Sequence, residues 1–419
     1  MQLNKVIIAP DSFKGNLTAR QVADIIAEEI NAGFPGCGIV KMPIADGGEG
    51  SVDAILSAIG GETFTVLVRS PDFRRIEASY GIADNATAII EMAQSSGITK
   101  QIGLHPMTST TYGFGQLILA ALNRGAREFT LCIGGSATTD GGCGMAAALG
   151  VRFIDEHGES FVPCGRTLCD IMRIDTGNID KRIAMSKFTV MCDVDNPLYG
   201  LTGAAHIYGP QKGADPGQIL LLDRGLRHYG DILTGQGDGS SARPDTLQDG
   251  RCLPHLQNET EEPFLCFRAE EPSLCSDLCS HADEPSLCFI PGAGAAGGLG
   301  AGCMAFLGAK LMSGIDVILK LFDFEKHRQD ADLIITGEGK LDSQSFQGKV
   351  LSGLLQNANG IPVWSVCGIC DCDEAVLNKH GVRVFETSEG ISVDESMRES
   401  EKYLRAAVRR AIESIKGKI

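Results

Sequence analysis

The sequence predicts an α/β protein, a doubly wound parallel sheet domain with a second α/β domain inserted into it. Three observations support this fold class. Short runs typical of buried strands alternate with amphipathic helical runs along most of the chain. Three strand-like runs follow one another over residues 62–93, which indicates a mixed or antiparallel sheet. The length of 419 residues favours two domains over one.

The N-terminal elements are marked by clear start signals. The run KVIIAP at 5–10 is expected to be a buried strand. A helix follows Thr18, because Thr18 and Gln21 have the spacing of a capping box. A second strand is expected at 38–43, and a second helix from Ser51 to Ile59.

The rest of the chain continues the alternation and suggests the domain boundaries. After a helical pattern at 113–125 and a strand in EFTLCIGG, the remaining elements are strands at 187–194, 331–339, 361–368 and 382–387, and a final helix at 396–415. We assign residues 1–62, 112–150 and 325–419 to a discontinuous Rossmann-like domain, and residues 63–111 and 151–324 to the second α/β domain.

Residues 236–290 interrupt this pattern. The segment contains eleven acidic residues against three arginines, and the near-repeats EEPSLCSD and DEPSLCF. Hydrophobic periodicity is lost across it, so we interpret it as a low-complexity insertion that lacks order. A zinc site is the alternative for its cysteines and histidine, although their spacing fits no standard zinc finger: Cys275, Cys279, His281 and Cys288.

Composition excludes several classes of partner. The net charge of −16 argues against nucleic acid and anionic membranes. The apolar runs are far shorter than the roughly 20 residues of a membrane span, and the N-terminus lacks the pattern of a signal peptide. We therefore expect a cytoplasmic protein that acts on a small molecule. The sequence does not determine its oligomeric state.

Five loops at predicted strand ends combine glycine with carboxylates, hydroxyls or lysine. Glycines allow several backbone N–H groups to point at one anion, and carboxylates bind Mg²⁺ or accept a proton from an alcohol. The set indicates a site for phosphate or carboxylate oxygens, whereas a single such loop could be an ordinary strand-to-helix turn. The chain has no P-loop motif. The five loops are PDSFKG, ADGGEG, GGSATTDGG, CDVDNPLYG and TGEGKLD.

Catalytic roles are assigned within these loops. We expect Asp193 to be the general base, since it is the first polar residue after an apolar run, and only one of Asp193 and Asp195 to serve the site. Lys14 would supply positive charge opposite the phosphates, unless it is a solvated loop lysine. The candidate ligands of Mg²⁺ or of substrate hydroxyls are Asp46, Glu49, Asp140, Glu338 and Asp342.

Glycines, hydroxyls and one lysine are expected to bind the anionic oxygens of substrate and phosphate. The segment PGAGAAGGLGAG also contains the spacing of a dinucleotide fingerprint, but no good strand precedes it, so a helix N-terminus facing phosphates is the better interpretation. The residues assigned to substrate or phosphate are Ser12, Gly47, Gly48, Gly134, Gly135, Ser136, Thr138, Gly292, Gly294, Gly297 and Lys340.

Taken together, the motifs resemble those of the bacterial type-1 glycerate kinases. The resemblance is carried by APDSFKGNLTA, PIADGGEG, GGSATTDGG, CDVDNPL, GAGAAGGLGA and TGEGKLDSQSFQGK, in this order, from about residue 4 to 235 and from 290 to 415. It implies ATP- and Mg²⁺-dependent phosphorylation of D-glycerate, with 2-phosphoglycerate as the usual product. It also implies an active site in the cleft between two domains.

Other functions remain open at this level. A protein that binds a small molecule without turnover could use the same scaffold, and a phosphatase could use the same carboxylates with Mg²⁺. The complete set of polar loops favours a kinase over both.

Overall fold

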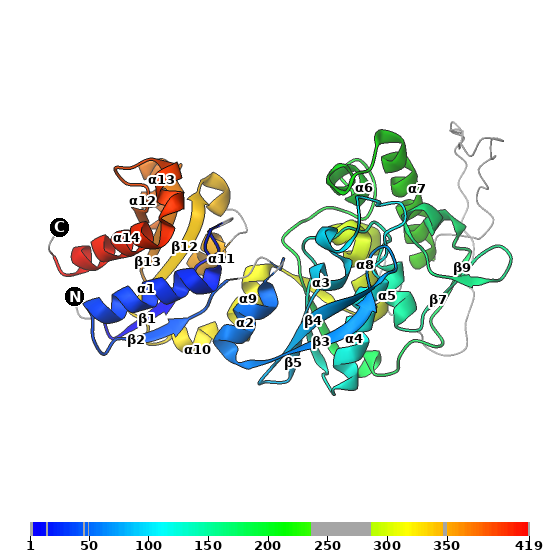
Figure 1. Ribbon diagram of the computed structural model, residues 1–419, viewed down its shortest axis with the longest axis horizontal. Helices are drawn as coiled ribbons and strands as arrows, with labels where there is room; N and C mark the ends of the chain where they lie inside the picture. The colour runs from blue at the N-terminus through cyan, green and yellow to red at the C-terminus, as the bar shows by residue number, and fades with distance from the viewer. Residues whose placement is uncertain are drawn as a thin grey trace.

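The computed structural model contains two large β-sheets at opposite ends of an elongated molecule (Figure 1). Within the described part of the chain, every helix is too short or too polar to cross a lipid bilayer. The two sheets contain the parallel strands that the sequence predicts for an α/β protein. The structure describes residues 3–13, 16–44, 47–48, 50–235, 286–346 and 350–417.

The first sheet has five parallel strands in the spatial order β2-β1-β12-β13-β14. In chain order this arrangement is 2-1-3-4-5, so the direction of winding reverses between β1 and β12. Ligands of open α/β sheets bind beyond the carboxyl ends of the strands at such a switch point. The strands are β1 (Lys5–Ile8), β2 (Gly38–Lys41), β12 (Leu333–Leu341), β13 (Val363–Cys370) and β14 (Val382–Glu386).

Helices cover both faces of this sheet because its strands are apolar on both sides. Val6 and Ile8 pack toward α1 and α14, whereas Ile7 between them packs toward α9, α10 and α11, as the alternation of a strand requires. Thr18 and Gln21 form the predicted capping box at the start of α1. The helices of this part are α1 (Ala19–Gly33), α9 (Gly314–Leu321), α10 (Phe324–Arg328), α11 (Val350–Asn357), α12 (Glu374–His380), α13 (Val393–Arg398) and α14 (Ser400–Ile415).

The second sheet is mixed, as the three consecutive strand-like runs predicted. Its order is β11-β10-β6-β5-β4-β3, with antiparallel pairing only at β3, β4 and β5. A small sheet of three strands lies beside it. The strands are β3 (Gly61–Arg69), β4 (Arg75–Ala83), β5 (Thr87–Glu91), β6 (Glu128–Cys132), β10 (Lys187–Met191) and β11 (Lys310–Met312), and in the small sheet β7 (Arg152–Ile154), β8 (Ser160–Phe161) and β9 (Arg173–Asp175).

The part of the molecule built on the second sheet contains α-helices and, within its loops, short 3-10 turns. The α-helices are α2 (Ser51–Ile59), α3 (Ala93–Ser96), α4 (Tyr112–Asn123), α5 (Cys143–Ala148), α6 (Ala204–Tyr208), α7 (Pro216–Leu233) and α8 (Ala295–Leu307). The 3-10 turns here are η1 (Ile98–Lys100), η2 (Gly165–Asp170), η3 (Ile183–Met185), η4 (Pro210–Lys212) and η6 (Leu287–Phe289), and η7 (Ser343–Phe346) follows β12.

One apolar cluster is shared by the two sheets. It joins Ile7 and Ile334 of the first sheet to Ile55 of α2, Ile315 of α9 and Met191 of β10. In Figure 1, α2 and α9 lie between the two halves. Packing, in addition to the connecting chain, therefore holds the two sheets in their relative positions.

The strand pairing corrects the predicted domain boundaries. Residues 112–150 were assigned to the domain of the first sheet, but β6 pairs with β5 and β10 and so belongs to the second sheet. Conversely, α9 packs in the cluster with Ile7 and Ile334, although 151–324 was assigned to the second domain. The error has a physical cause, since a parallel strand followed by a helix looks the same in sequence whichever sheet it joins.

The prediction that residues 236–290 lack order is wrong for the end of this segment. Residues 236–285, with Cys275, Cys279 and His281, lie outside the described residues. Residues 286–290 are ordered, and Leu287 and Cys288 are buried in the cluster that also contains Leu233 of α7. A Cβ atom on Gly230 of α7 would lie 2.7 Å from the Cys288 sulfur, so this cysteine is a core residue of the fold.

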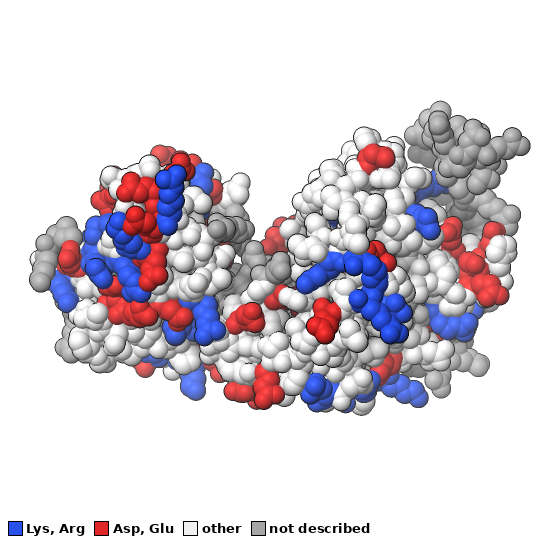
Figure 2. Space-filling view, in the orientation of Figure 1, with Lys and Arg blue, Asp and Glu red and all other residues white. Residues whose placement is uncertain are grey.

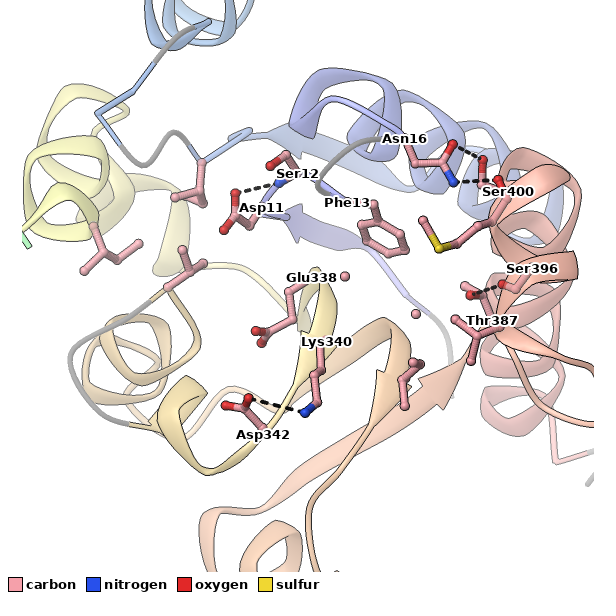
Figure 3. A pocket seen from close by; sticks show the side chains of 18 of the residues that line it. Asp11, Ser12, Phe13, Asn16, Glu338, Lys340, Asp342, Thr387, Ser396 and Ser400 are labelled. Carbon is pink, nitrogen blue, oxygen red and sulfur yellow. Dashed lines mark hydrogen bonds and ion pairs between the residues drawn. The ribbon is translucent and has the colours of Figure 1, made fainter. Parts of the chain in front are cut away.

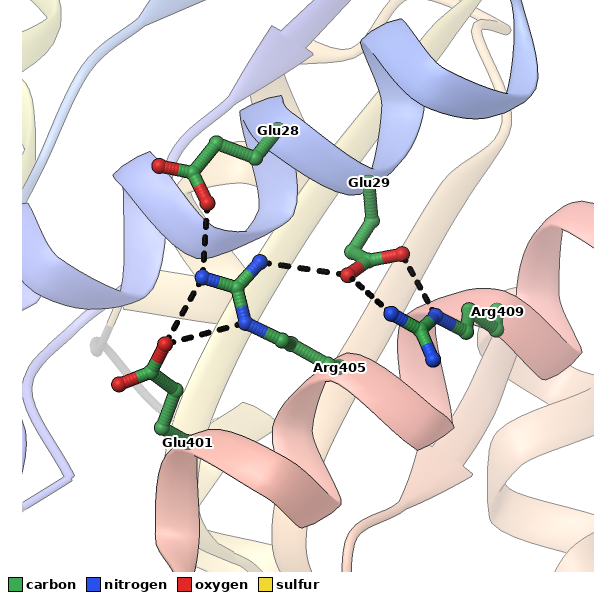
Figure 4. A network of polar contacts seen from close by, with 5 residues as sticks. All are labelled: Glu28, Glu29, Glu401, Arg405 and Arg409. Carbon is green, nitrogen blue, oxygen red and sulfur yellow. Dashed lines mark hydrogen bonds and ion pairs between the residues drawn. The ribbon is translucent and has the colours of Figure 1, made fainter.

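A network of charged groups joins α1 to α14 (Figure 4). Glu29 accepts hydrogen bonds from Arg409 Nε at 2.8 Å, Arg409 Nη2 at 3.0 Å and Arg405 Nη1 at 3.2 Å. Only 8% of the Glu29 side chain is exposed, against 62% for Glu28, which contacts the same Arg405. The hydrogen bond from Arg409 holds the pKa of Glu29 below its ordinary value.

Replacing Glu29 by Gln is expected to lower the free energy of unfolding by about 1–3 kcal/mol, because buried charged hydrogen bonds are lost. The matched variant E28Q removes an exposed charge and should change it by less than about 0.5 kcal/mol. Denaturant unfolding at neutral pH measures both. Because the folded-state pKa of Glu29 is lowered, its contribution is present above the unfolded pKa and disappears as the pH falls through the folded one. The difference between wild type and E29Q should therefore shrink below about pH 4.5. Equal effects of E29Q and E28Q would contradict this account.

Candidate active site

A pocket of about 940 Å³ lies at the switch point of the first sheet. Its walls come from the carboxyl ends of β1 and β12, from the loop after β10 of the second sheet, and from α13. The space-filling view shows the surface hollowed between the two halves of the molecule (Figure 2). The size is at the upper end of the range for small-molecule sites, which gives room for more than one ligand group.

One end of the pocket is rich in carboxylates (Figure 3). Asp11 and Ser12 follow β1, and the Ser12 amide donates to Asp11 Oδ1 at 2.6 Å. Glu338, Lys340 and Asp342 come from the end of β12 and the turn that follows it. The structure thus brings the predicted residues Ser12, Glu338, Lys340 and Asp342 into one pocket. Asp11, which sequence reasoning passed over, lies with them.

Short contacts hold the side chains that follow β12. Ser345 of η7 donates to Glu338 Oε2 at 2.7 Å, and its hydroxyl accepts from the Asp342 amide at 3.2 Å. Lys340 Nζ lies 3.0 Å from Asp371 and 3.9 Å from Asp342. The hydrogen bond to Asp371 raises the pKa of Lys340. Lys340 is therefore a cation throughout the neutral pH range.

Two aspartates from the second sheet complete this end. Asp193 and Asp195 both line the pocket. The expectation that only one of them serves the site stays a prediction. Strand β10 ends at Met191, and the residues after it leave the strand conformation. Asp193 Oδ1 accepts a hydrogen bond of 2.7 Å from the amide of Gly314, the first residue of α9. The helix N-terminus favours the ionised form of this carboxylate.

The other end of the pocket is uncharged. Phe13, Val393 and Met397 form apolar walls. Asn16 links the loop after β1 to the α13–α14 junction, because its amide nitrogen donates to the Met397 carbonyl at 2.7 Å and its side-chain oxygen accepts from Ser400 at 2.8 Å. None of these residues was predicted, since apolar, hydroxyl and amide side chains carry no pattern that marks a ligand wall, whether they lie in a loop, as Phe13 and Asn16 do, or on α13 and α14.

The glycine-rich loop after β6 lies beside the end of β10. The Gly134 amide donates to the Gly47 carbonyl at 3.0 Å, and a Cβ atom on Gly47 would lie 3.3 Å from Met191. The structure therefore brings Gly47, Gly48 and Gly134 together. Their predicted contact with substrate or phosphate stays a prediction. Gly135 is exposed at the tip of this loop, and Ser136 follows it.

Two buried charged residues that the sequence did not reveal support this region. Glu91, 1% exposed, accepts from the Val52 amide at 2.6 Å and so ties the end of β5 to the first turn of α2. Burial raises the pKa of Glu91. Lys212 is also 1% exposed, and its Nζ donates to Ser136 Oγ.

Asp140 and Thr138 are not placed as predicted. Both are fully buried. Asp140 Oδ2 accepts from the Thr111 amide at 2.7 Å and from the Thr111 hydroxyl at 2.9 Å, and its Oδ1 accepts from the Gly142 amide at 3.2 Å. Burial raises the pKa of Asp140. The carboxylate therefore organises the loop from inside and has no access to a metal in the pocket. The Thr138 hydroxyl is enclosed as well.

The glycines of 292–298 allow close packing and do not face the pocket. A Cβ atom would lie 2.1 Å from the Pro197 carbonyl at Gly294, 2.0 Å from the Thr138 carbonyl at Gly297, and 2.7 Å from the Cys192 sulfur at Gly292. All three are buried, so their predicted contact with phosphate is not supported. Their small size lets α8 pack against the loops after β6 and β10.

The remaining predicted residues, Lys14, Asp46 and Glu49, lie outside the described residues. Among the residues that are described, no group of three or more histidine, cysteine or acidic side chains forms a metal centre.

The comparisons with known proteins agree with the fold and with the polar loops. A model of the glycerate kinase family matches residues 6–416. A glycerate kinase of Halalkalibacterium halodurans is 39% identical over 414 residues, covering 97% of each chain. A glycerate 2-kinase of Escherichia coli K12 is 37% identical over 401 residues, covering 94% of this chain and 93% of the relative. A crystal structure from Salmonella typhimurium LT2, described as a glycerate kinase 2, has a TM-score of 0.79 at 32% identity and covers 99% of both chains.

The chain therefore belongs to the glycerate kinase family, and it is an enzyme of the kinase class. The resemblance noted in the sequence is confirmed.

Replacing Gly297 by Ala is expected to lower the free energy of unfolding by about 3 kcal/mol, because a side chain there meets the Thr138 carbonyl and strains a residue with positive φ. The φ angle is +74°. Gly308, at the other end of α8, is the matched control: its φ is +60°, with no atom within 4 Å of an added Cβ. G308A should cost only about 1–2 kcal/mol. Denaturant unfolding compares the two variants, and equal losses would show that the packing at Gly297 is unimportant.

Proposed function

We propose that this enzyme transfers the terminal phosphoryl group of ATP to a hydroxyl of D-glycerate, giving 2-phosphoglycerate. The observation that carries the proposal is a pocket with one carboxylate-rich end and one uncharged end at the switch point of a parallel sheet. The names of the relatives, glycerate kinase and glycerate 2-kinase, support the choice of substrate and product.

The two ends of the pocket match the two parts of a nucleotide. The uncharged end, with Phe13, Val393 and Met397, suits the base and ribose, which carry no charge. The triphosphate would then extend toward Ser12 and Lys340 at the ends of β1 and β12. This orientation directs the terminal phosphate toward Asp193 and Asp195 of the second sheet.

A polyanion cannot enter a carboxylate-rich pocket without a neutralising cation. Asp11, Asp193, Asp195, Glu338 and Asp342 line the pocket, whereas Lys340 is the single lysine in its described lining. Mg²⁺ would supply the missing positive charge and reduce repulsion between the phosphates and an incoming oxygen. It is commonly held by one or two carboxylates together with phosphate oxygens, so a complete protein cage is unnecessary. The oxygen donors Asp11 and Glu338 fit this role, with Asp46 and Glu49 as candidates from the sequence.

Asp193 is the proposed general base. It lies in the pocket, and its carboxylate accepts a hydrogen bond from the amide of Gly314 at the start of α9. The carboxylate would accept the proton of the substrate hydroxyl as that oxygen attacks the terminal phosphorus. The bond to the leaving phosphate oxygen breaks in the same transfer, and ADP is released. Lys14 would stabilise the charge on the phosphates.

Replacing Asp193 by Asn is expected to lower kcat by at least about 100-fold, because proton acceptance is lost while the shape of the side chain is kept. The Kd for the nucleotide should change little. The matched variant D195N makes the same change, from a carboxylate to an amide, at the second aspartate of this part of the pocket. Steady-state kinetics and nucleotide titration measure both variants. A larger loss of kcat in D195N would move the role of the base to Asp195.

The function itself is tested with the purified wild type. ADP should form only when ATP, Mg²⁺ and D-glycerate are all present, and phosphorus NMR should identify 2-phosphoglycerate. Accumulation of 3-phosphoglycerate would correct the position of transfer. The absence of ADP formation would refute the proposed function.

A further inference from the structure

The side chain of Lys212 lies beneath the glycine-rich loop that follows β6. Lys212 is the last residue of η4, and it is 1% exposed. Its Nζ donates to Ser136 Oγ at 2.7 Å and to the Thr138 carbonyl at 2.6 Å. Both partners are uncharged, and among the described residues no carboxylate forms an ion pair with this ammonium group.

Burying an ammonium group without a direct counter-ion is costly. Burial lowers the pKa of Lys212 to about 7, although the nearby charge of Asp140 acts in the opposite direction. The Asp140 carboxylate does not compensate by contact, because its oxygens accept from Thr110, Thr111, Gly142 and Gly144. A neutral side chain of similar length could hold the loop at lower cost. An anion bound at the loop tip would favour the charged form of Lys212 that burial disfavours.

The tip of the loop is placed to receive such an anion. Gly134 is partly exposed, Gly135 is exposed and Ser136 is 7% exposed, so the loop reaches the surface next to Ser136, the residue that Lys212 contacts. Gly135 has a φ of +73°, which turns the backbone sharply at this point. The Gly134 N–H already donates to the Gly47 carbonyl, so an anion at this turn would be bound by the tip at Gly135 and Ser136.

The tip also lies one strand away from the proposed base. Strands β6 and β10 are parallel neighbours, with Cys132 opposite Met191, so the residues that follow them leave the sheet side by side. Adjacent strands are about 4.8 Å apart, which is comparable with the length of a three-carbon acid. The loops that carry Asp193 and Ser136 therefore leave the sheet next to each other, as binding of one small molecule by both requires.

We propose that the loop tip at Gly135 and Ser136 binds the carboxylate of the substrate, and that Lys212 is the positioning residue that orients Ser136 and supplies positive charge behind this binding site. The proposal rests on the proposed function, since it assumes that the acceptor is a hydroxy acid. On this proposal, the enzyme prefers acids to uncharged polyols because of the charge of Lys212. The ligand does not have to contact that lysine.

The test compares D-glycerate with its amide, D-glyceramide, which has the same hydroxyls and no charge. Replacing Lys212 by Met should raise the KM for D-glycerate by about 30-fold or more, the scale of losing a buried charge partner. The KM for ATP and the kcat/KM for D-glyceramide should each change by less than about 3-fold, because neither depends on the carboxylate-binding site. The ratio of kcat/KM for D-glycerate to kcat/KM for D-glyceramide should therefore fall sharply. The control variant K187M removes a lysine that is 85% exposed on β10 and should leave all constants unchanged.

A second variant keeps the test decisive if K212M does not fold, as judged by thermal unfolding. S136A leaves the lysine in place and removes only its hydroxyl partner, so it should raise the KM for D-glycerate about 5-fold, leave the KM for ATP unchanged and affect D-glyceramide less, because a hydrogen bond to a neutral oxygen is weaker than one to a carboxylate. If the variants lower kcat/KM for acid and amide by the same factor, Lys212 only maintains the shape of the loop and the proposal is overturned. Failure of the wild type to phosphorylate D-glycerate is a separate result, which refutes the proposed function before any variant is compared.

Discussion

Ile7 and Ile334 of the first sheet pack in one cluster with Ile55 of α2 and Met191 of β10. Because a packed interior resists sliding, this contact determines where the ends of β1, β12 and β10 meet. The pocket exists only because these ends face a common space, with Asp11 and Glu338 from one sheet and Asp193 from the other. A change in the packing of α2 or α9 would thus alter the site without touching any polar residue in it.

The loops around the site are held by buried charges as well as by glycine. Asp140 gathers the amides of the loop after β6, Glu91 accepts from the first turn of α2, and Lys212 supports Ser136. Each of these side chains is almost completely buried. In the interior of a protein a hydrogen bond to a charged group is strong, and its loss is costly. The glycines at 292–298 contribute in another way, since they let α8 approach the same loop closely. The loops therefore have a defined shape before any ligand binds.

The elements of the fold were predictable because their signals are local. The capping box at Thr18, the helix from Ser51 to Ile59 and the end of β12 at Glu338, Lys340 and Asp342 all depend on a few neighbouring residues. The sheet that β6 joins, the burial of Asp140 and the partner of Lys212 depend on residues far along the chain. A carboxylate in a glycine loop has the same sequence signature whether it points into a pocket or into the core. Asp193 was found because it follows a strand, whereas Phe13 and Met397 follow no pattern that marks a ligand wall.

The pairing of β1 has a consequence for how the chain folds. Val6 pairs with Ile39 on one side, close in sequence, but on the other side it pairs with Leu333, which is synthesised hundreds of residues later. All strands of the second sheet lie between these two, from Gly61 to Met312, so that sheet can assemble first during translation. Until β12 emerges, β1 is an edge strand whose apolar faces and backbone groups are open to other chains. Completion of the first sheet therefore waits for the C-terminal third of the chain, and until then β1 offers an unpaired apolar edge.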